Sequence, residues 1–93
     1  MANKFLIHAK DDYVGVATKD IKKDESVQGV FLDSGKDITV KATEDVSLGH
    51  KIALRDIKKG EKIIEYSEPI GQATQDIRKG DHVHVHNIKT MRW

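Results

Sequence analysis

The stretch "TQDIRKGDHV" (residues 74–83) carries a motif that the chain uses four times. An aspartate is followed by isoleucine or valine, then two residues, a glycine, two more residues and a second β-branched residue. The other copies are "TKDIKKDESV" (18–27), "TEDVSLGHKI" (43–52) and "LRDIKKGEKI" (54–63). Their spacing along the chain is unequal, so they are one reused turn and not a solenoid of fixed period.

The residue types of this motif predict a structural corner. An aspartate side chain can accept hydrogen bonds from backbone N–H groups at the start of a turn. Gly49, Gly60 and Gly80 would supply a positive φ, and Asp24 takes that position in the first copy. The two β-branched residues return the chain to a core. We interpret these corners as elements that build the fold and do no chemistry.

Between the corners, short runs alternate apolar and polar residues or are rich in β-branched residues, which is typical of strands. No stretch keeps a helical period for three turns. The expected fold is all-β, with at most single helical turns. The expected strands lie at 4–9, 13–19, 26–32, 37–43, 50–56, 61–67, 70–76 and 82–88.

Bulk composition limits the classes of protein to consider. With 93 residues, the chain is expected to form a single domain over 1–93. Sixteen basic and fifteen acidic residues are interspersed and give a net charge of +1, which argues against a nucleic-acid partner. No cysteine is present, so disulfides and thiolate metal sites are excluded. No segment is apolar enough for a signal peptide or a membrane span, and we expect a cytoplasmic protein with no membrane partner.

The segment "HVHVHNIKT" (82–90) places three histidines at alternate positions. On a strand, side chains two residues apart lie about 6.5–7 Å apart on one face. His84 and His86 could therefore share an ion, whereas His82 and His86, about 13 Å apart, could not. The alternative is an exposed polar face opposite buried Val83 and Val85.

The second corner reads "GHK", with His50 where the third and fourth copies carry Glu61 and Asp81. A departure from a structural template is a signal of function. Lys51 follows and would suit a substrate carboxylate or a developing enediolate. Arg55 is a second candidate for binding substrate, and a solvated strand end explains it equally well.

Three separated motifs, "GHKIAL" (49–54), "YSEPIG" (66–71) and "HVHVHN" (82–87), occur in an order that resembles the altronate and galactarate dehydratase family. The chain is similar to the SAF-type β-clip domain of that family from Phe5 to Thr90. The resemblance implies a compact SAF-type β-clip. It also implies elimination of water from a sugar acid, by proton removal beside a carboxylate and loss of a group from the next carbon.

The resemblance further implies a small subunit paired with a large catalytic subunit on a separate chain. A divalent metal, with iron as the first choice, would serve the complete enzyme and be held mostly by the large subunit. His84, His86, His50 and Lys51 would be catalytic, Asn87 would bind substrate, and His84 and His86 would be the metal ligands on this chain. The isolated chain, as a monomer or a homo-oligomer, is expected to be inactive, because a domain this small cannot enclose a sugar acid.

Three alternatives stay open. The first is (2R)-sulfolactate sulfo-lyase, a carbon–sulfur lyase of the same group that releases sulfite and whose alpha subunit this chain resembles. The second is a non-catalytic SAF binding module, and the third is an independent metal-binding protein. Met91 and Trp93 would suit an anchor on a partner. His8 is expected to be a half-exposed histidine, Tyr66 to shape a turn and pack on the core, and Glu65 to face solvent or an interface.

Overall fold

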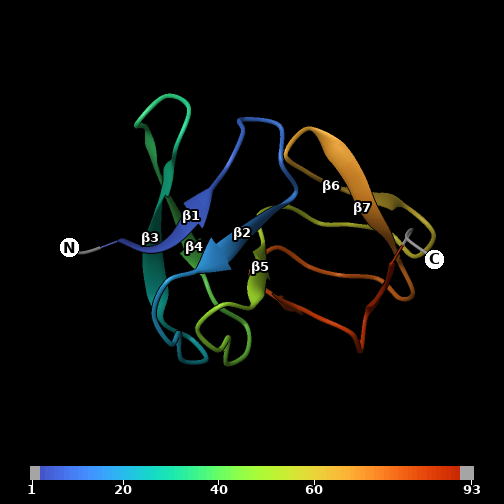
Figure 1. The fold of residues 1–93 in the computed structure, drawn as a ribbon. Helices are drawn as coiled ribbons and strands as arrows, with labels where there is room; N and C mark the ends of the chain where they lie inside the picture. Colours follow the sequence, from blue (N-terminus) through green and yellow to red (C-terminus); the bar gives the residue numbers. More distant parts are fainter. Residues whose placement is uncertain (1–2, 91–93) are drawn as a thin grey trace.

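The computed structural model describes residues 3–90, which form nine short β-strands and no helix (Figure 1). The strands are β1 (Asn3–Ile7), β2 (Val14–Ala17), β3 (Ser26–Phe31), β4 (Asp37–Lys41), β5 (Lys51–Ala53), β6 (Lys62–Glu65), β7 (Glu68–Ala73), β8 (His82–Val83) and β9 (Ile88–Thr90). The all-β prediction is confirmed. No helix in this part of the chain offers a stretch long and apolar enough to cross a membrane.

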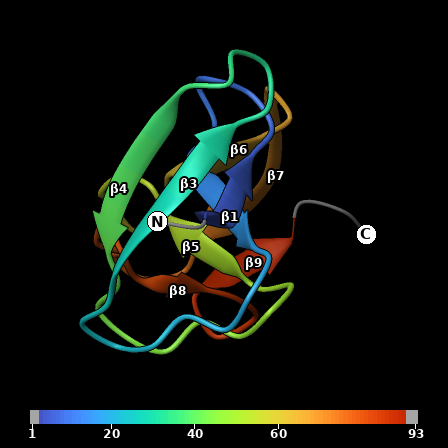
Figure 2. The ribbon, with the colours of Figure 1, turned by 90° about the vertical axis from the view of Figure 1, so that its left-hand side faces the viewer.

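The strands form two sheets. One has six strands in the order β4-β3-β1-β2-β5-β8, and the other has three in the order β6-β7-β9. Pairing is antiparallel throughout except between β1 and β3. Figure 2 shows β8 beside β5 at one end of the molecule, with β9 close by. The two histidine-bearing segments of the sequence therefore meet through the β5–β8 pair.

The four repeated corners associate in two pairs. Ile21 of the first corner forms an antiparallel bridge with Val46 of the second, and Ile57 of the third pairs with Ile77 of the fourth. All four side chains are buried. Each corner therefore packs against a second corner, and the buried β-branched residue of one lies beside that of the other.

The motif aspartates bind across each pair. Asp20 accepts a hydrogen bond from the backbone N–H of Leu48 at 2.9 Å, and Asp45 accepts one from Lys23 at 2.8 Å. The third and fourth corners repeat this exchange through Asp56 with Lys79 and Asp76 with Lys59. The aspartates accept backbone N–H groups as expected, but these N–H groups belong to the paired corner.

The predicted positive φ angles are present in every corner. They are 70° at Asp24, 86° at Gly49, 88° at Gly60 and 93° at Gly80. Two further positive angles, at Tyr66 and Ser67, close the β6–β7 hairpin, and the Asp12 carboxylate accepts both of their backbone N–H groups. Tyr66 shapes this turn as expected, but it is 63% exposed and does not join the core.

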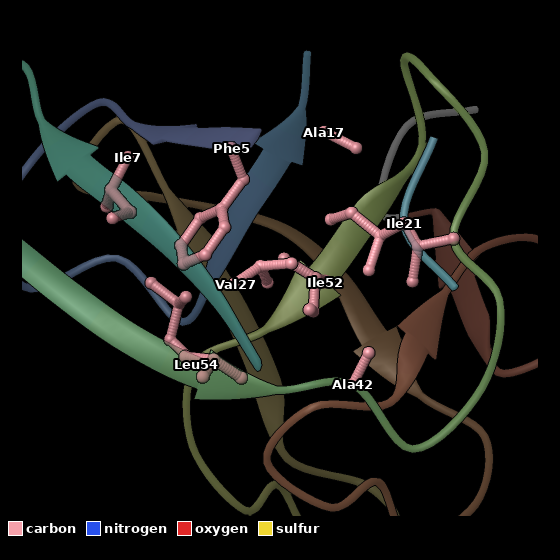
Figure 3. Close-up of a cluster of buried hydrophobic side chains, with 10 residues drawn as sticks. Phe5, Ile7, Ala17, Ile21, Val27, Ala42, Ile52 and Leu54 are labelled. Carbon is pink, nitrogen blue, oxygen red and sulfur yellow. The ribbon is translucent and has the colours of Figure 1, made fainter. Parts of the chain in front are cut away.

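Two apolar clusters fill the interior, one for each pair of corners. The first gathers around Phe5 and includes Ile21, Val46 and Ile52 (Figure 3). The second includes Val14, Ala53, Ile57, Ile63, Ala73, Ile77 and Val83. Neighbouring residues Ile52 and Ala53 of β5 point into different clusters. Strand β5 is therefore anchored on both faces, and the site residues at its start are rigidly placed.

Candidate functional site

The histidine-rich segment is not one strand. Strand β8 ends at Val83, residues 84–87 form a turn, and β9 starts at Ile88. Val85 is 81% exposed at the tip of this turn, so the expectation that it lies buried opposite the histidines was wrong. The statement that His82 and His86 are too far apart to share an ion was also wrong, since their ring centroids lie 5.1 Å apart. Both errors come from treating a folded-back turn as an extended strand.

Asn87 causes the turn. Its side-chain oxygen accepts the backbone N–H of His84 at 3.0 Å, and its side-chain nitrogen donates to the carbonyl of His82 at 2.8 Å. The side chain is 2% exposed. These two hydrogen bonds take the place of bonds between strands in this segment. They hold the backbone of His82 and His84, and therefore the positions from which the two imidazoles project. Contact of Asn87 with substrate stays a prediction, while its hold on the turn is plain in the geometry.

His50 occupies a corner position that has a different use in the other copies. There, Glu25, Glu61 and Asp81 accept the backbone N–H three residues earlier in their own corner. An imidazole replaces the carboxylate in the second corner, and its ring instead turns toward β8. The replacement of a carboxylate by His50 thus marks the one corner whose side chain at this position bonds to another part of the chain instead of capping its own turn.

Three imidazoles come together at this place. His50 Nδ1 lies 2.8 Å from His82 Nε2, a hydrogen bond in which one nitrogen donates and the other accepts. The His50 ring also stacks on His84 with centroids 3.9 Å apart. All three side chains are half-buried. The β5–β8 register, which pairs Ile52 with His82, brings these residues together from segments more than thirty positions apart along the chain.

Electrostatics favour uncharged imidazoles in this cluster. Burial, followed by the neighbouring His86 and His50, lowers the pKa of His82. Burial, followed by the charges of His50, His86 and Lys51, lowers the pKa of His84. Both rings are therefore neutral at pH 7 and offer a lone pair, either to a proton or to a metal ion.

Lys51 extends the cluster toward a buried carboxylate that the sequence reading placed on solvent. Glu65 is 6% exposed, with Lys51 Nζ at 4.0 Å and His8 Nε2 at 3.8 Å. His8 in turn stacks on Tyr66 at 3.8 Å. The pattern of "KIIEYS" could have indicated that Glu65 is buried. Residues two apart on a strand lie on the same face, and Ile63 points into the core.

Lys51 and Glu65 line a hollow of about 330 Å³ together with Ile70, Val85, Ile88 and Thr90. The hollow is open and has one cation and one carboxylate on an otherwise mainly apolar lining. It adjoins the imidazoles, because Lys51 follows His50 and its charge acts on His84. A small anionic molecule placed here would meet the ammonium group of Lys51 together with the side chain of Glu65.

Glu65→Gln is expected to raise the midpoint of thermal unfolding at pH 7. Burial raises the pKa of Glu65, and the attraction of Lys51 and His8 offsets that effect only in part. The folded state favours the protonated form of the Glu65 carboxyl group. The stability that this preference contributes is full below pH 4.5 and is lost as pH rises through the raised folded pKa. Glutamine has the same shape without this loss.

Circular dichroism melts between about pH 4 and pH 7.5 check this expectation. The variant and the wild type should coincide at the acid end and separate as pH rises. Glu68→Gln, an exposed carboxylate on the next strand, is the matched control and should follow the wild type throughout. A variant less stable than the wild type at pH 7 would mean that the ion pairs outweigh burial.

Arg55 lies apart from the cluster. Its guanidinium group stacks on the Tyr13 ring at 4.3 Å from the centroid. It lines two other hollows, of about 490 and 790 Å³, and neither contains a histidine among its described residues. A role for Arg55 in binding substrate stays a prediction that the cluster geometry does not support.

Two sets of side chains in residues 3–90 could hold a metal ion. One is His50, His82 and His84, and the other is Glu44, His82 and His86, with the ligand atoms of each set within 4.8 Å of one another. His84 and His86, expected as a pair, belong to different sets. Imidazole nitrogen with or without one carboxylate is a donor set that suits zinc, iron, copper or nickel. The residues therefore fit a divalent transition metal.

The fold and this site define a SAF domain of the lyase type. The family model for the altronate/galactarate dehydratase SAF domain matches residues 3–91, and the chain belongs to this family.

Among curated relatives, the chain is 38% identical to the (2R)-sulfolactate sulfo-lyase subunit alpha of Chromohalobacter salexigens, over 100% of both chains. It is 42% identical to the altronate dehydratase of Bacillus subtilis, over 97% of this chain and 17% of the relative. The corresponding figures for the altronate dehydratase of Escherichia coli are 45%, 90% and 16%. The chain therefore spans the full length of one alpha subunit and about a sixth of the two dehydratases.

Proposed function

We propose that this chain is the small component of a lyase that acts on a hydroxy acid, completing an active site with a large catalytic component. The observation that carries the proposal is the convergence of His50, His82 and His84 beside Lys51, on the scaffold of a dehydratase domain. His86 lies at the rim of this cluster, against His82. His50, Lys51, His84 and His86 are the residues that we assign to the reaction.

The chemistry of such a lyase matches what the cluster offers. Removal of a proton beside a carboxylate needs a base that is uncharged at neutral pH and a positive charge for the developing enediolate. His84 is neutral at pH 7, and Lys51 supplies the cation beside it. We assign proton transfer to an imidazole of this cluster and carboxylate binding to Lys51. A bound divalent metal, iron in our proposal, would add stabilisation of negative charge on the substrate oxygens.

For the leaving group, water from a sugar acid is the first candidate, supported by membership of the altronate/galactarate dehydratase SAF family. Sulfite from (2R)-sulfolactate is the second candidate. It is supported by the match over the full length of a protein named as an alpha subunit. That name also supports a partner on another polypeptide.

The isolated chain is proposed to be inactive. The hollow beside Lys51 is open, and the imidazoles are half-buried at the surface. A proton transfer from carbon requires a site from which water is excluded. The large component is expected to cover the cluster and to provide the walls that this domain lacks.

Reconstitution tests the proposed function. The chain is combined with its large component and assayed on altronate, galactarate and (2R)-sulfolactate. The expected result is turnover by the mixture and none by either component alone. Formation of a keto acid without sulfite supports the dehydratase, and sulfite release supports the sulfo-lyase. Activity of the large component without this chain would contradict the proposal.

A further inference from the structure

His82 is the centre of the metal-capable residues. It belongs to both ligand sets, with His50 and His84 on one side and Glu44 and His86 on the other. A single imidazole nitrogen binds one ion, so the two sets compete for His82 and one ion occupies the region. The sequence had pointed to His84 and His86 as the pair that shares an ion.

We propose that His50, His82 and His84 form a site for one divalent transition-metal ion, held by this chain itself. The proposal deepens the proposed function, because it moves the metal ligands from the large component to the small one. Bonds of about 2.1 Å to a common ion would place the three nitrogens roughly 3.4 Å apart. In the structure the three ligand atoms lie within 4.8 Å of one another, and side-chain rotations would bring them to the shorter spacing. A fourth coordination position would stay open for substrate or water.

The three-imidazole set is favoured over the set with Glu44 for a structural reason. One carboxylate oxygen of Glu44 already accepts the backbone N–H of His82 at 3.2 Å. His86 is exposed and sits beyond the turn tip. His50, by contrast, is released from the capping role that its carboxylate counterparts perform, and its ring already contacts both partners.

The backbone beneath this set is held in place before any ion binds. Asn87 ties His84 N–H and the His82 carbonyl to one buried amide. His50 follows Gly49, whose N–H donates to the carbonyl of Ala17, and the Ala17 N–H donates to the His50 carbonyl, both at 2.8 Å. Support of this kind around the ligands raises metal affinity, typically 10- to 100-fold.

The test is equilibrium titration of the tag-free full chain with Zn²⁺, and with Co²⁺ as an absorption probe. The expected result is one ion per chain, not displaced by Mg²⁺ or Ca²⁺, which prefer oxygen ligands. His50→Ala and His84→Ala should each weaken binding more than about 100-fold, and Asn87→Ala about 10- to 100-fold. His8→Ala is the matched control, and it should leave the affinity unchanged because His8 lies in neither set.

Glu44→Gln and His86→Ala decide between the two sets. Both should change the affinity only a few-fold, and circular dichroism of every variant should match the wild type. The proposal is overturned if these two variants weaken binding as much as His50→Ala, or if the folded chain binds no stoichiometric ion. Since the titration needs neither substrate nor the large component, a negative result leaves the lyase assay as a separate question.

Discussion

Gly80→Ala should lower the free energy of unfolding by about 3–5 kcal/mol, whereas Gly60→Ala, at the equivalent position of the paired corner, should lower it by about 1–2 kcal/mol. The two glycines have nearly the same backbone angle, with φ of 93° and 88°. Alanine is strained at either position for that reason. The difference between the two comes from what surrounds them.

A Cβ at Gly80 would lie 2.1 Å from the carbonyl oxygen of Lys41, whereas nothing lies within 4 Å of a Cβ at Gly60. The Lys41 oxygen is backbone at the end of β4, where the Gly80 carbonyl also accepts the N–H of Thr43 at 3.0 Å. Neither segment can move away without breaking the hydrogen bond between Thr43 and Gly80. The clash therefore adds to the strain at Gly80 alone.

Urea unfolding followed by circular dichroism measures both variants against the wild type. A domain of this size has a stability of about 5–14 kcal/mol, so Gly80→Ala should move the midpoint far to lower urea concentration. Equal losses in the two variants would show that the backbone angle, and not the contact with Lys41, sets the cost.

His84→Ala is expected to lower kcat of the reconstituted lyase by about 10²-fold or more, because the variant loses one ligand of the proposed metal site. His84 stacks on His50, and its lowered pKa leaves the ring uncharged, with a lone pair for the ion. The side chain is only half-buried, so its loss should change stability by no more than about 1 kcal/mol.

Steady-state kinetics of the assembled enzyme, with pull-down of the large component as a check on assembly, measure this effect. Lys59→Ala is the control, an exposed side chain in a corner that carries no imidazole, and it should keep wild-type turnover. A His84→Ala enzyme that assembles and turns over within a few-fold of the wild type would remove His84 from the reaction.

Much of the candidate site followed from the chain alone. His50 stood out because the third and fourth corners carry a carboxylate at its position. The structure shows that these two carboxylates cap their turns, as Glu25 does in the first corner. The arrangement of the last histidines did not follow, because alternation of apolar and polar residues predicts a strand. Asn87, by accepting from His84 and donating to His82, bends that segment into a turn instead. Glu65 was misplaced because a charged residue is mostly exposed, and its burial depends on contacts with Lys51 of β5 and with His8, which follows β1.

The amino-acid sequence by itself determined the all-β class, the four corners and their positive φ angles. Each of these is set by short-range backbone chemistry within about ten residues. Only the tertiary structure decided which corners pair, which glycine is pressed against another strand, and which imidazoles meet. Those outcomes depend on close packing between residues far apart in the chain, which no local pattern encodes. The pairing of β5 with β8 is the clearest case, since it turns one unusual corner histidine and two from the last turn into a single cluster.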